Sequence, residues 1–138
     1  MFEQCLYFNT MSLARTVEKA WTDAFRRFGL TPPQAFCLRA VIANPGCRPS
    51  ALADTLGIAR ATATRLLDHL QRKGLIERQV AQADSREFLV VPTAKAKAQA
   101  KGIERASAQM TAKVKAVLGE SQFVNVVGKL RSAREELG

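Results

Sequence analysis

The most constraining stretch of this 138-residue chain is GIARATATRLLDHLQRKGLIERQ, which runs from residue 57 to residue 79. Its apolar residues recur at three- and four-residue spacing, at Ala63, Leu66, Leu67 and Leu70. This spacing predicts an amphipathic helix from about Arg60 to Lys73, which Gly74 ends as a left-handed C′ residue. A run typical of a strand follows at once. A short helix that is anchored along one side therefore leads directly into a strand.

The neighbouring segments complete a recognisable motif. Ser50 is predicted to cap a short helix over ALADTLG, and the turn GIA joins that helix to the one described above. Two short helices joined by a turn that contains glycine make a helix-turn-helix. The runs LIERQV and REFLVV, separated by the polar AQADS, then predict a β-hairpin that Pro92 ends. The sequence thus predicts a mainly α fold with a small β-hairpin wing, which is a winged helix-turn-helix.

Further helices are predicted on both sides of this motif. The segment from Cys5 to Phe28 has helical apolar spacing, and Thr31 caps a helix that begins at Pro32. Thr93 caps a long Ala- and Lys-rich helix over residues 94–119, and a last helix starts at Ser121. We expect one structural domain with three parts: an N-terminal dimerisation helix over 1–31, the winged-helix lobe over 32–93 and C-terminal dimerisation helices over 94–138. The apolar stripes of the terminal helices have no place in the lobe, so we expect a homodimer that buries them.

The charge of the chain points to the class of partner. The formal net charge is +9, and the sequence pI is about 10.1. Such a balance in a globular chain favours a polyanion, most often nucleic acid, although a basic and merely solvated surface is the alternative. No apolar run approaches the roughly 18 residues of a membrane span. The N-terminal stretch lacks the basic leader of a signal peptide, so we expect a cytoplasmic protein without membrane contact.

The polar side of the central helix carries the candidate DNA contacts. Small residues near the start of a helix let its backbone approach base edges in the major groove, and an arginine fork fits a guanine or a phosphate. An ordinary solvated helix face is the alternative interpretation. The residues on this side are Arg60, Ala61, Thr62, Thr64, Arg65, Asp68, His69 and Arg72.

The segment LADTLGIARATATRLLDHLQRKGLIERQVAQADSREFLVVPTAKAKA resembles the DNA-binding core of MarR-type (multiple antibiotic resistance regulator) transcriptional regulators. The resemblance implies a dimer that binds double-stranded DNA at a pseudo-palindrome, with the central helix in the major groove and the wing over the minor groove. It also implies DNA contacts from Arg60, Thr62, Thr64 and Arg65. Asp84 and Arg86 match the family's D-x-R wing motif, with Arg86 at the wing tip.

Five further positions are compared with the family pattern. We expect Asp68, one turn beyond Thr64, to pair with an arginine of the wing. Ala59 stands where the family has a serine or threonine cap, and such a loss costs about 1 kcal/mol. Leu89 and Val91 take outward wing positions that are often basic in the family, which predicts fewer phosphate contacts. Ala96 replaces a usual glycine.

The three cysteines give separate predictions. Cys37 lies among apolar residues and is predicted to be a buried, inert thiol. Cys47 is predicted to be exposed beside Arg48, which would favour the thiolate. Cys5 opens the first helix and is a candidate redox thiol, because peroxide-sensing relatives carry a cysteine nearby. Its position is about two residues from the expected one, a rotation of roughly 200 degrees, so an inert thiol is the alternative.

The remaining functional classes follow from what the sequence contains. His69 is the lone histidine and no nucleophile motif or phosphate loop occurs, so we expect neither an enzyme nor a metal site, and no cofactor. Relatives bind a small aromatic or phenolic effector between the dimerisation helices and the lobe. Four residues lie on the helix that would line that crevice: Tyr7, Asn9, Arg15 and Trp21. We predict a ligand- or redox-responsive repressor. The rivals are a non-specific architectural DNA binder and a winged-helix subunit for protein interaction.

Overall fold

The computed structural model describes residues 1–81 and 87–138. The predicted wing residues Asp84 and Arg86 lie outside the described residues. The elements are α1 (Leu6–Phe25), a 3₁₀ turn (Arg26–Phe28), α2 (Pro32–Ala43), α3 (Pro49–Leu56), α4 (Arg60–Arg72), β1 (Ile76–Val80), β2 (Phe88–Pro92), α5 (Ala94–Leu118) and α6 (Glu120–Leu137). The predicted order of helices and hairpin is confirmed.

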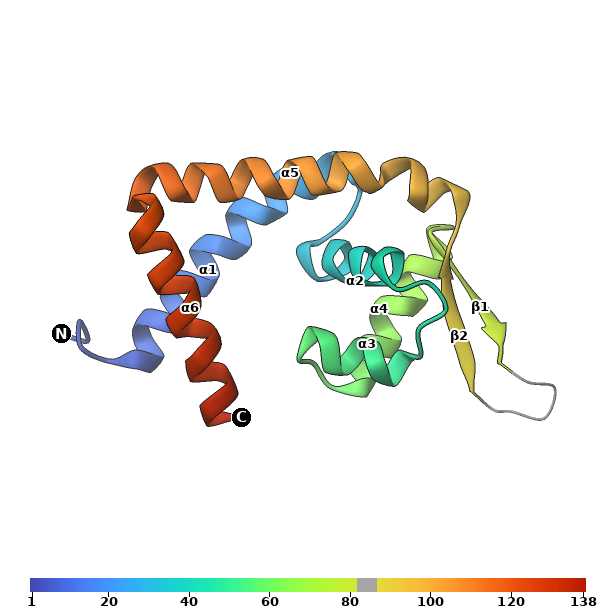
Figure 1. The fold of residues 1–138 in the computed structure, drawn as a ribbon, viewed down its shortest axis with the longest axis horizontal. Coiled ribbons are helices and arrows are strands. Elements are labelled where there is room, and N and C mark those ends of the chain that lie inside the picture. Colours follow the sequence, from blue (N-terminus) through green and yellow to red (C-terminus); the bar gives the residue numbers. More distant parts are fainter. Residues whose placement is uncertain (82–86) are drawn as a thin grey trace.

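The elements form an arch with two unequal sides (Figure 1). Helix α5 runs along the top of the arch, and α1 and α6 lie at the side where both chain ends are found. Helices α2, α3 and α4 and the hairpin form the other side. We call α2 to β2 the lobe, and α1 with α6 the arm. Helix α5 belongs to both, since it packs on α2 and β2 of the lobe and on both helices of the arm.

The hydrophobic core is centred on the lobe and extends to Phe25 of α1 and Ile103 of α5. Leu38 of α2, Leu67 and Leu70 of α4 and Val90 of β2 are all fully buried in it, and Ile76 of β1 is almost so. Burying one such side chain contributes about 1.5–3 kcal/mol. The helical spacing of α4 and the two-residue alternation of the strands place these side chains on one side, which fixes α4 and the hairpin to each other.

Two of the predicted helix caps are present. The Thr31 side chain accepts from the backbone N–H of Gln34, and the Gln34 side chain accepts from that of Thr31, which completes a capping box. The Thr93 hydroxyl accepts from the N–H of Ala96 in the same way. Both caps fix the start of a helix against the lobe.

The predicted cap at Ser50 is wrong. The N-cap of α3 is Arg48, and Pro49 takes the first helical position. The ring of a proline presets the backbone for the first turn of a helix and has no N–H that needs a partner, so the helix begins one residue before the serine. Ser50 therefore lies inside the helix, where its side chain makes no capping hydrogen bond.

The hairpin is tied to the rest of the lobe at its base. Strands β1 and β2 are antiparallel, with Arg78 opposite Val90. The N–H of Gly46 donates to Val90 O at 2.8 Å, and the N–H of Val90 donates to Cys47 O at 2.9 Å. The loop between α2 and α3 thus pairs with β2 through a single bridge at Cys47, on the edge of β2 that β1 leaves open. Leu89 and Val91 lie on the other side of β2 from the buried Val90, as the alternation predicted, but they are half-buried and not fully exposed.

Helix α5 passes very close to the 3₁₀ turn. A Cβ atom built on Gly102 would lie 3.0 Å from Cε1 of the Phe28 ring, closer than such atoms normally approach. Phe28 packs against the core, so the contact fixes how closely α5 can cross the end of α1.

The arm leaves much of its apolar surface uncovered. Helix α6 has no buried residue, and Phe25 is the sole buried residue of α1. Large apolar side chains of both helices are exposed, including Leu6, Tyr7, Phe8, Met11, Leu13, Val17, Val124, Val127, Leu130 and Leu137. Within the described parts of the chain, no helix is both long and apolar enough to cross a bilayer.

Candidate nucleic-acid interface

Helix α4 is held by one face and free on the other. Ala63, Leu67 and Leu70 are fully buried against the lobe. The turn before the helix contains Gly57 with a φ of 65°, a left-handed conformation that glycine adopts without strain. Ala59 is the N-cap and has no side chain that could accept a hydrogen bond. The opposite face of α4 is thereby fixed in direction, while the first turn lacks a side-chain cap.

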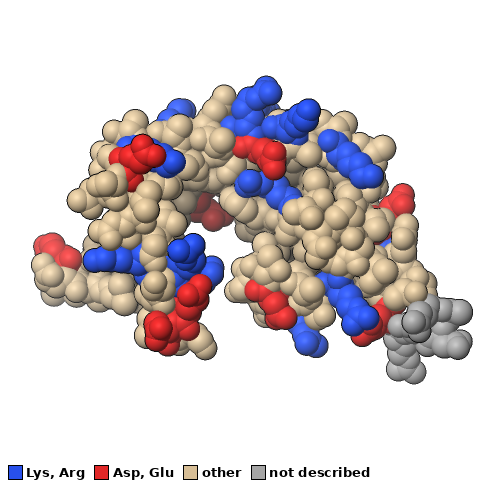
Figure 2. All heavy atoms as spheres, viewed as in Figure 1, with Lys and Arg blue, Asp and Glu red and all other residues tan. Residues whose placement is uncertain are grey.

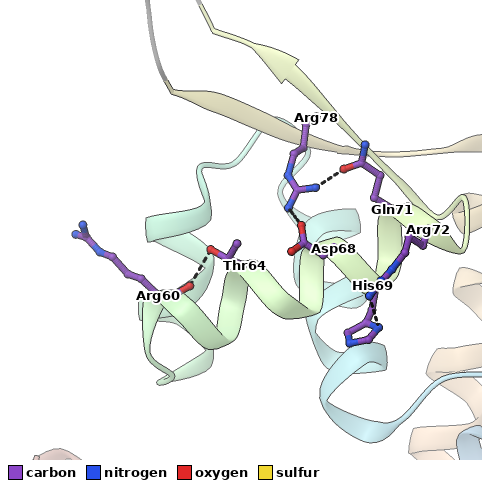
Figure 3. Close-up of polar contacts among 7 residues, drawn as sticks. All are labelled: Arg60, Thr64, Asp68, His69, Gln71, Arg72 and Arg78. Atoms are coloured by element: carbon purple, nitrogen blue, oxygen red, sulfur yellow. Dashed lines mark hydrogen bonds and ion pairs between the residues drawn. The ribbon is translucent and has the colours of Figure 1, made fainter.

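The predicted contact residues occupy that free face. Arg60, Ala61, Thr64, Arg65 and His69 are exposed, and Thr62 is half-buried. The Arg60 side chain extends away from the lobe (Figure 3). The first two turns of α4 therefore present two arginines and two threonines to solvent, with a methyl side chain between them.

Local hydrogen bonds order several of these side chains. Nη2 of Arg65 donates to Oγ1 of Thr62 at 3.2 Å, so these two lie one above the other as the helical spacing predicts. The Thr64 hydroxyl donates to the carbonyl O of Arg60 at 3.0 Å. Nη2 of Arg72 lies 3.0 Å from Nδ1 of His69 (Figure 3). Arg65 retains further N–H donors, because a guanidinium carries five.

The wing is joined to α4 through an arginine that sequence reasoning did not single out. Nη2 of Arg78, on β1, lies 2.6 Å from Oδ1 of Asp68 (Figure 3). Its Nη1 donates to Gln71, and its guanidinium stacks on the Phe88 ring at 5.3 Å. The expectation that Asp68 pairs with a wing arginine is thus confirmed, and the partner is Arg78. The signal was the alternation of β1, which turns Arg78 toward α4 and leaves Glu77 on the other side.

A small polar depression lies beside the start of α4. It has a volume of about 270 Å³ and lies between α3, α4 and β2. Arg48, Ser50, Arg60 and Thr64 are among its lining residues, and Nε of Arg48 lies 3.4 Å from Oε2 of Glu87. The depression places two arginines and two hydroxyl side chains next to the free face of α4, which is a suitable set for phosphate oxygens.

The thiols differ from the prediction in one case. Cys5 is exposed and Cys37 is buried, as predicted, but Cys47 is only 7% exposed, so its predicted exposure is wrong. The backbone of Cys47 pairs with Val90, which draws the side chain into the core. Burial raises the pKa of the Cys37 thiol to about 11 and also raises the pKa of Cys47, so neither favours the thiolate.

A larger and mostly apolar crevice separates the arm from the lobe. It has a volume of about 610 Å³ between α1, α2 and α5, and its lining residues are Ala14, Val17, Glu18, Trp21, Pro32, Pro33, Phe36, Ser107 and Thr111. Of the four candidate residues on the first helix, Trp21 lines this crevice, and it also packs on the core. Tyr7, Asn9 and Arg15 are not among the lining residues; the Asn9 amide instead donates to the carbonyls of Phe2, Glu3 and Cys5.

One serine joins three helices at the floor of this crevice. Ser107 of α5 is buried, and its Oγ accepts from Nε1 of Trp21 at 3.4 Å and from Nη1 of Arg39 at 3.3 Å. The Arg39 guanidinium also stacks on the Phe36 ring at 5.1 Å. A guanidinium and two aromatic rings therefore meet where α1, α2 and α5 converge.

A helix with a solvent-facing set of arginines and threonines, followed by a hairpin pinned beside it, defines the winged helix-turn-helix class of DNA-binding proteins. Comparison with known proteins gives the family. The MarR family model matches residues 28–87. Residues 28–87 of this chain thus match the MarR family, and the comparisons support a DNA-binding transcriptional regulator.

Individual relatives extend the similarity to the whole chain. A Thauera aromatica protein, named as a transcriptional regulatory protein for the hcr operon, is 28% identical over an alignment of 116 positions, which covers 78% of this chain and 70% of the relative. The S. aureus MepR–DNA complex has a TM-score of 0.87 at 20% identity and covers 99% of this chain and 100% of that one. The repressor CouR bound to p-coumaroyl-CoA has a TM-score of 0.89 at 23% identity, with 98% and 95% covered. The arm and α5 thus share the fold of these proteins.

Proposed function

We propose that the chain acts in the cytoplasm as a homodimeric repressor that binds a pseudo-palindromic operator and releases it when a small effector binds. The observation that carries the proposal is the free face of α4, where Arg60, Thr64 and Arg65 are exposed on a helix whose other face is fully buried. A rigid helix with a fixed outward face is what readout in the major groove requires.

Within this proposal the contacts have different roles. Arg65 and the small residues Ala61 and Thr62 face the bases, while Arg60 and the nearby depression hold the phosphate backbone. Asp68 positions the wing through Arg78 and does not itself contact DNA. His69 lies at the groove edge. Replacing an arginine that reads a guanine costs about 1–3 kcal/mol and relaxes specificity at one position, whereas loss of a phosphate contact weakens binding to all sequences.

The dimer follows from the uncovered surface of the arm. Exposed apolar side chains on α1 and α6 form a surface that a monomer would leave in water. A second copy related by a two-fold axis can cover it with the same surface. Two lobes would then present two α4 helices, and half-sites about one helical turn apart follow from the symmetry.

The crevice between arm and lobe suits an effector with an aromatic ring and an anionic group. Trp21 and Phe36 line the crevice with their rings, and Arg39, behind the lining, stacks on Phe36 and donates to Ser107. The charged lining residue is Glu18, so the cation at Arg39 has to outweigh it for an anion to bind. A ligand there contacts both α1 of the arm and α2 of the lobe, so it favours one spacing between them over another. CouR, bound to p-coumaroyl-CoA, makes aromatic acids and their thioesters the first compounds to test. Trp21 is the sole tryptophan of the chain, so quenching of its fluorescence reports occupancy directly.

Genomic selection tests the proposal as a whole. The purified protein is incubated with sheared DNA from its own source at near-physiological salt, and the bound fragments are sequenced. We expect one or a few pseudo-palindromes to be enriched among the fragments bound by the wild type. We expect the Arg65→Ala variant not to enrich them. Uniform recovery would support an architectural DNA binder, and no recovery would support a protein-interaction subunit.

A further inference from the structure

The basic charge of the chain is concentrated on a helix that the proposed DNA contacts do not use. Helix α5 carries six basic residues and a single acidic one, Glu104. Its net charge of +5 is more than half of the +9 of the whole chain. Figure 2 shows Lys and Arg side chains gathered along the edge of the molecule formed by α5, with an acidic residue among them.

Three of these residues form a line, which we call the α5 stripe: Lys97, Lys101 and Arg105. They lie four residues apart, so their positions rise by about 6 Å each along the helix. All three are exposed. The rotation of α5 is fixed, because Ala96, Ile103 and Ala106 on its other side are buried. The stripe therefore faces solvent on the folded chain.

The charges of the stripe are not neutralised by the folded chain. Among the described residues, no carboxylate lies within ion-pair distance of Lys97, Lys101 or Arg105, although Glu104 is on the same helix. By contrast, Lys95 donates to the carbonyl O of Lys73, and Lys115 stacks on the Phe123 ring. The three residues of the stripe thus remain available to an anionic partner.

The stripe cannot reach the duplex that α4 would bind. Helix α2 packs against α5 on one side and against α3 and α4 on the other (Figure 1). The lobe therefore lies between the stripe and the free face of α4.

The composition of the stripe decides the kind of partner. Its exposed neighbours on the helix are small, such as Ala94, Ala98 and Ala108, and the larger apolar residues of this half of α5 are turned inward. A helix that lies on a membrane needs an apolar face to insert, and none is free here. A duplex instead offers a phosphate about every 3.4 Å of helix axis on each strand, which a straight row of cations can follow.

We propose that the α5 stripe binds the phosphate backbone of a second DNA segment, so that one protein can hold two duplexes at once. Binding of DNA by the stripe goes beyond the proposed function. Holding two duplexes at once rests on the proposed function, because α4 must bind the first duplex. Contact with phosphates alone carries no sequence information, so any neighbouring DNA serves as the second segment.

The test variant is Lys97→Gln/Lys101→Gln/Arg105→Gln, in which glutamine keeps the helix propensity and removes the charge. The matched control, Lys129→Gln/Arg131→Gln/Arg134→Gln on α6, removes the same charge from exposed positions. A duplex enriched by genomic selection, or one of random sequence, is immobilised and loaded with protein, and a fluorescent duplex of random sequence is added. We expect the wild type and the control to capture the second duplex, and the stripe variant to capture none above background.

Further measurements separate the possible failures. Loss of three phosphate contacts lowers the slope of log K against log salt for the second duplex by about 2.7. An Arg60→Gln/Arg65→Gln variant tests the α4 site alone. If this variant binds single duplexes as tightly as the wild type, the proposed function fails. The stripe is still tested independently by the capture experiment with the stripe variant. Equal capture by the stripe variant overturns the inference. The inference is also overturned if the stripe variant loses the wild-type binding to phosphatidylserine vesicles but still captures the second duplex.

Discussion

The lobe and the arm use the same kinds of residue in opposite ways. In the lobe, Leu38, Leu67 and Val90 are fully buried, whereas Val124 on α6 is 61% exposed. The core of the lobe is closed with the help of Phe25 of α1 and Ile103 of α5, and packing within the lobe fixes the direction of α4. The arm leaves its apolar surface uncovered. The two regions therefore separate two tasks: the lobe sets what α4 presents, and the arm sets where a second lobe would stand.

The strongest test of this difference is to shorten one apolar side chain to alanine in each region. Leu67→Ala should destabilise the protein by about 2–5 kcal/mol, because it leaves a cavity in a fully packed core. Val124→Ala should change the unfolding of dilute protein by about 0.5 kcal/mol or less, since the side chain is exposed. Urea unfolding at low protein concentration measures both. Equal effects would contradict the division into a lobe with a closed core and an arm with an uncovered surface.

The buried thiol of Cys37 gives the lobe a pH dependence. Its pKa is raised to about 11, from an ordinary value of 9.0, by burial and then by the neighbouring Cys47. The stability that this neutral thiol confers is present below pH 9 and is lost as the pH rises toward 11, because the unfolded thiol ionises first. The loss is at most about 3 kcal/mol. Unfolding free energies from pH 8 to 11 should fall less steeply in Cys37→Ala, and identical slopes would contradict the role of this thiol.

The link between wing and α4 is expected to give a smaller effect. Asp68→Asn removes the charge that Arg78 faces, and Asp68 is about half exposed, so the loss of stability should be about 1 kcal/mol. The larger consequence is a wing that is less firmly placed, which weakens DNA binding. Affinity for a selected operator should therefore fall while the far-ultraviolet circular dichroism is unchanged. Glu77→Gln, on the other side of β1, is the control. If Asp68→Asn kept full affinity for DNA, Asp68 would not be needed to position the wing.

The smallest predicted change is a gain. Ala59 has the extended backbone of an N-cap, with φ −66° and ψ 150°, but no hydroxyl. Ala59→Ser should stabilise the first turn of α4 by about 0.5–1 kcal/mol through a hydrogen bond to a free backbone N–H. Thermal unfolding measures the gain, and Ala61→Ser, inside the helix, is the control. No difference between the two variants would show that the first turn does not need a cap.

The sequence predicted the elements well because periodicity and capping residues are local signals. Thr31, Thr93 and Gly74 each lie where the local pattern put them. The errors came from contacts between distant segments. Cys47 looked exposed because it follows a turn, yet its pairing with Val90, far along the chain, buries it. The role of Arg78 in positioning the wing depends in the same way on a distant residue, because it requires Asp68 of α4 to lie opposite β1. The crevice, too, exists only where three helices meet, and no local pattern reveals it.

Gly102 has a consequence that extends beyond its own contact. It allows α5 to cross close over Phe28, near the junction of lobe and arm, and α5 is about 37 Å long. A methyl group at that crossing would require the Phe28 ring or α5 to move by a few tenths of an ångström. If α5 moves by tilting, its far end is displaced more than the point of contact. In the proposed homodimer, the distance between the two lobes, and with it the preferred spacing of half-sites, would then shift. A single substitution far from α4 would thus alter the choice of operator and leave every side chain proposed to read bases unchanged.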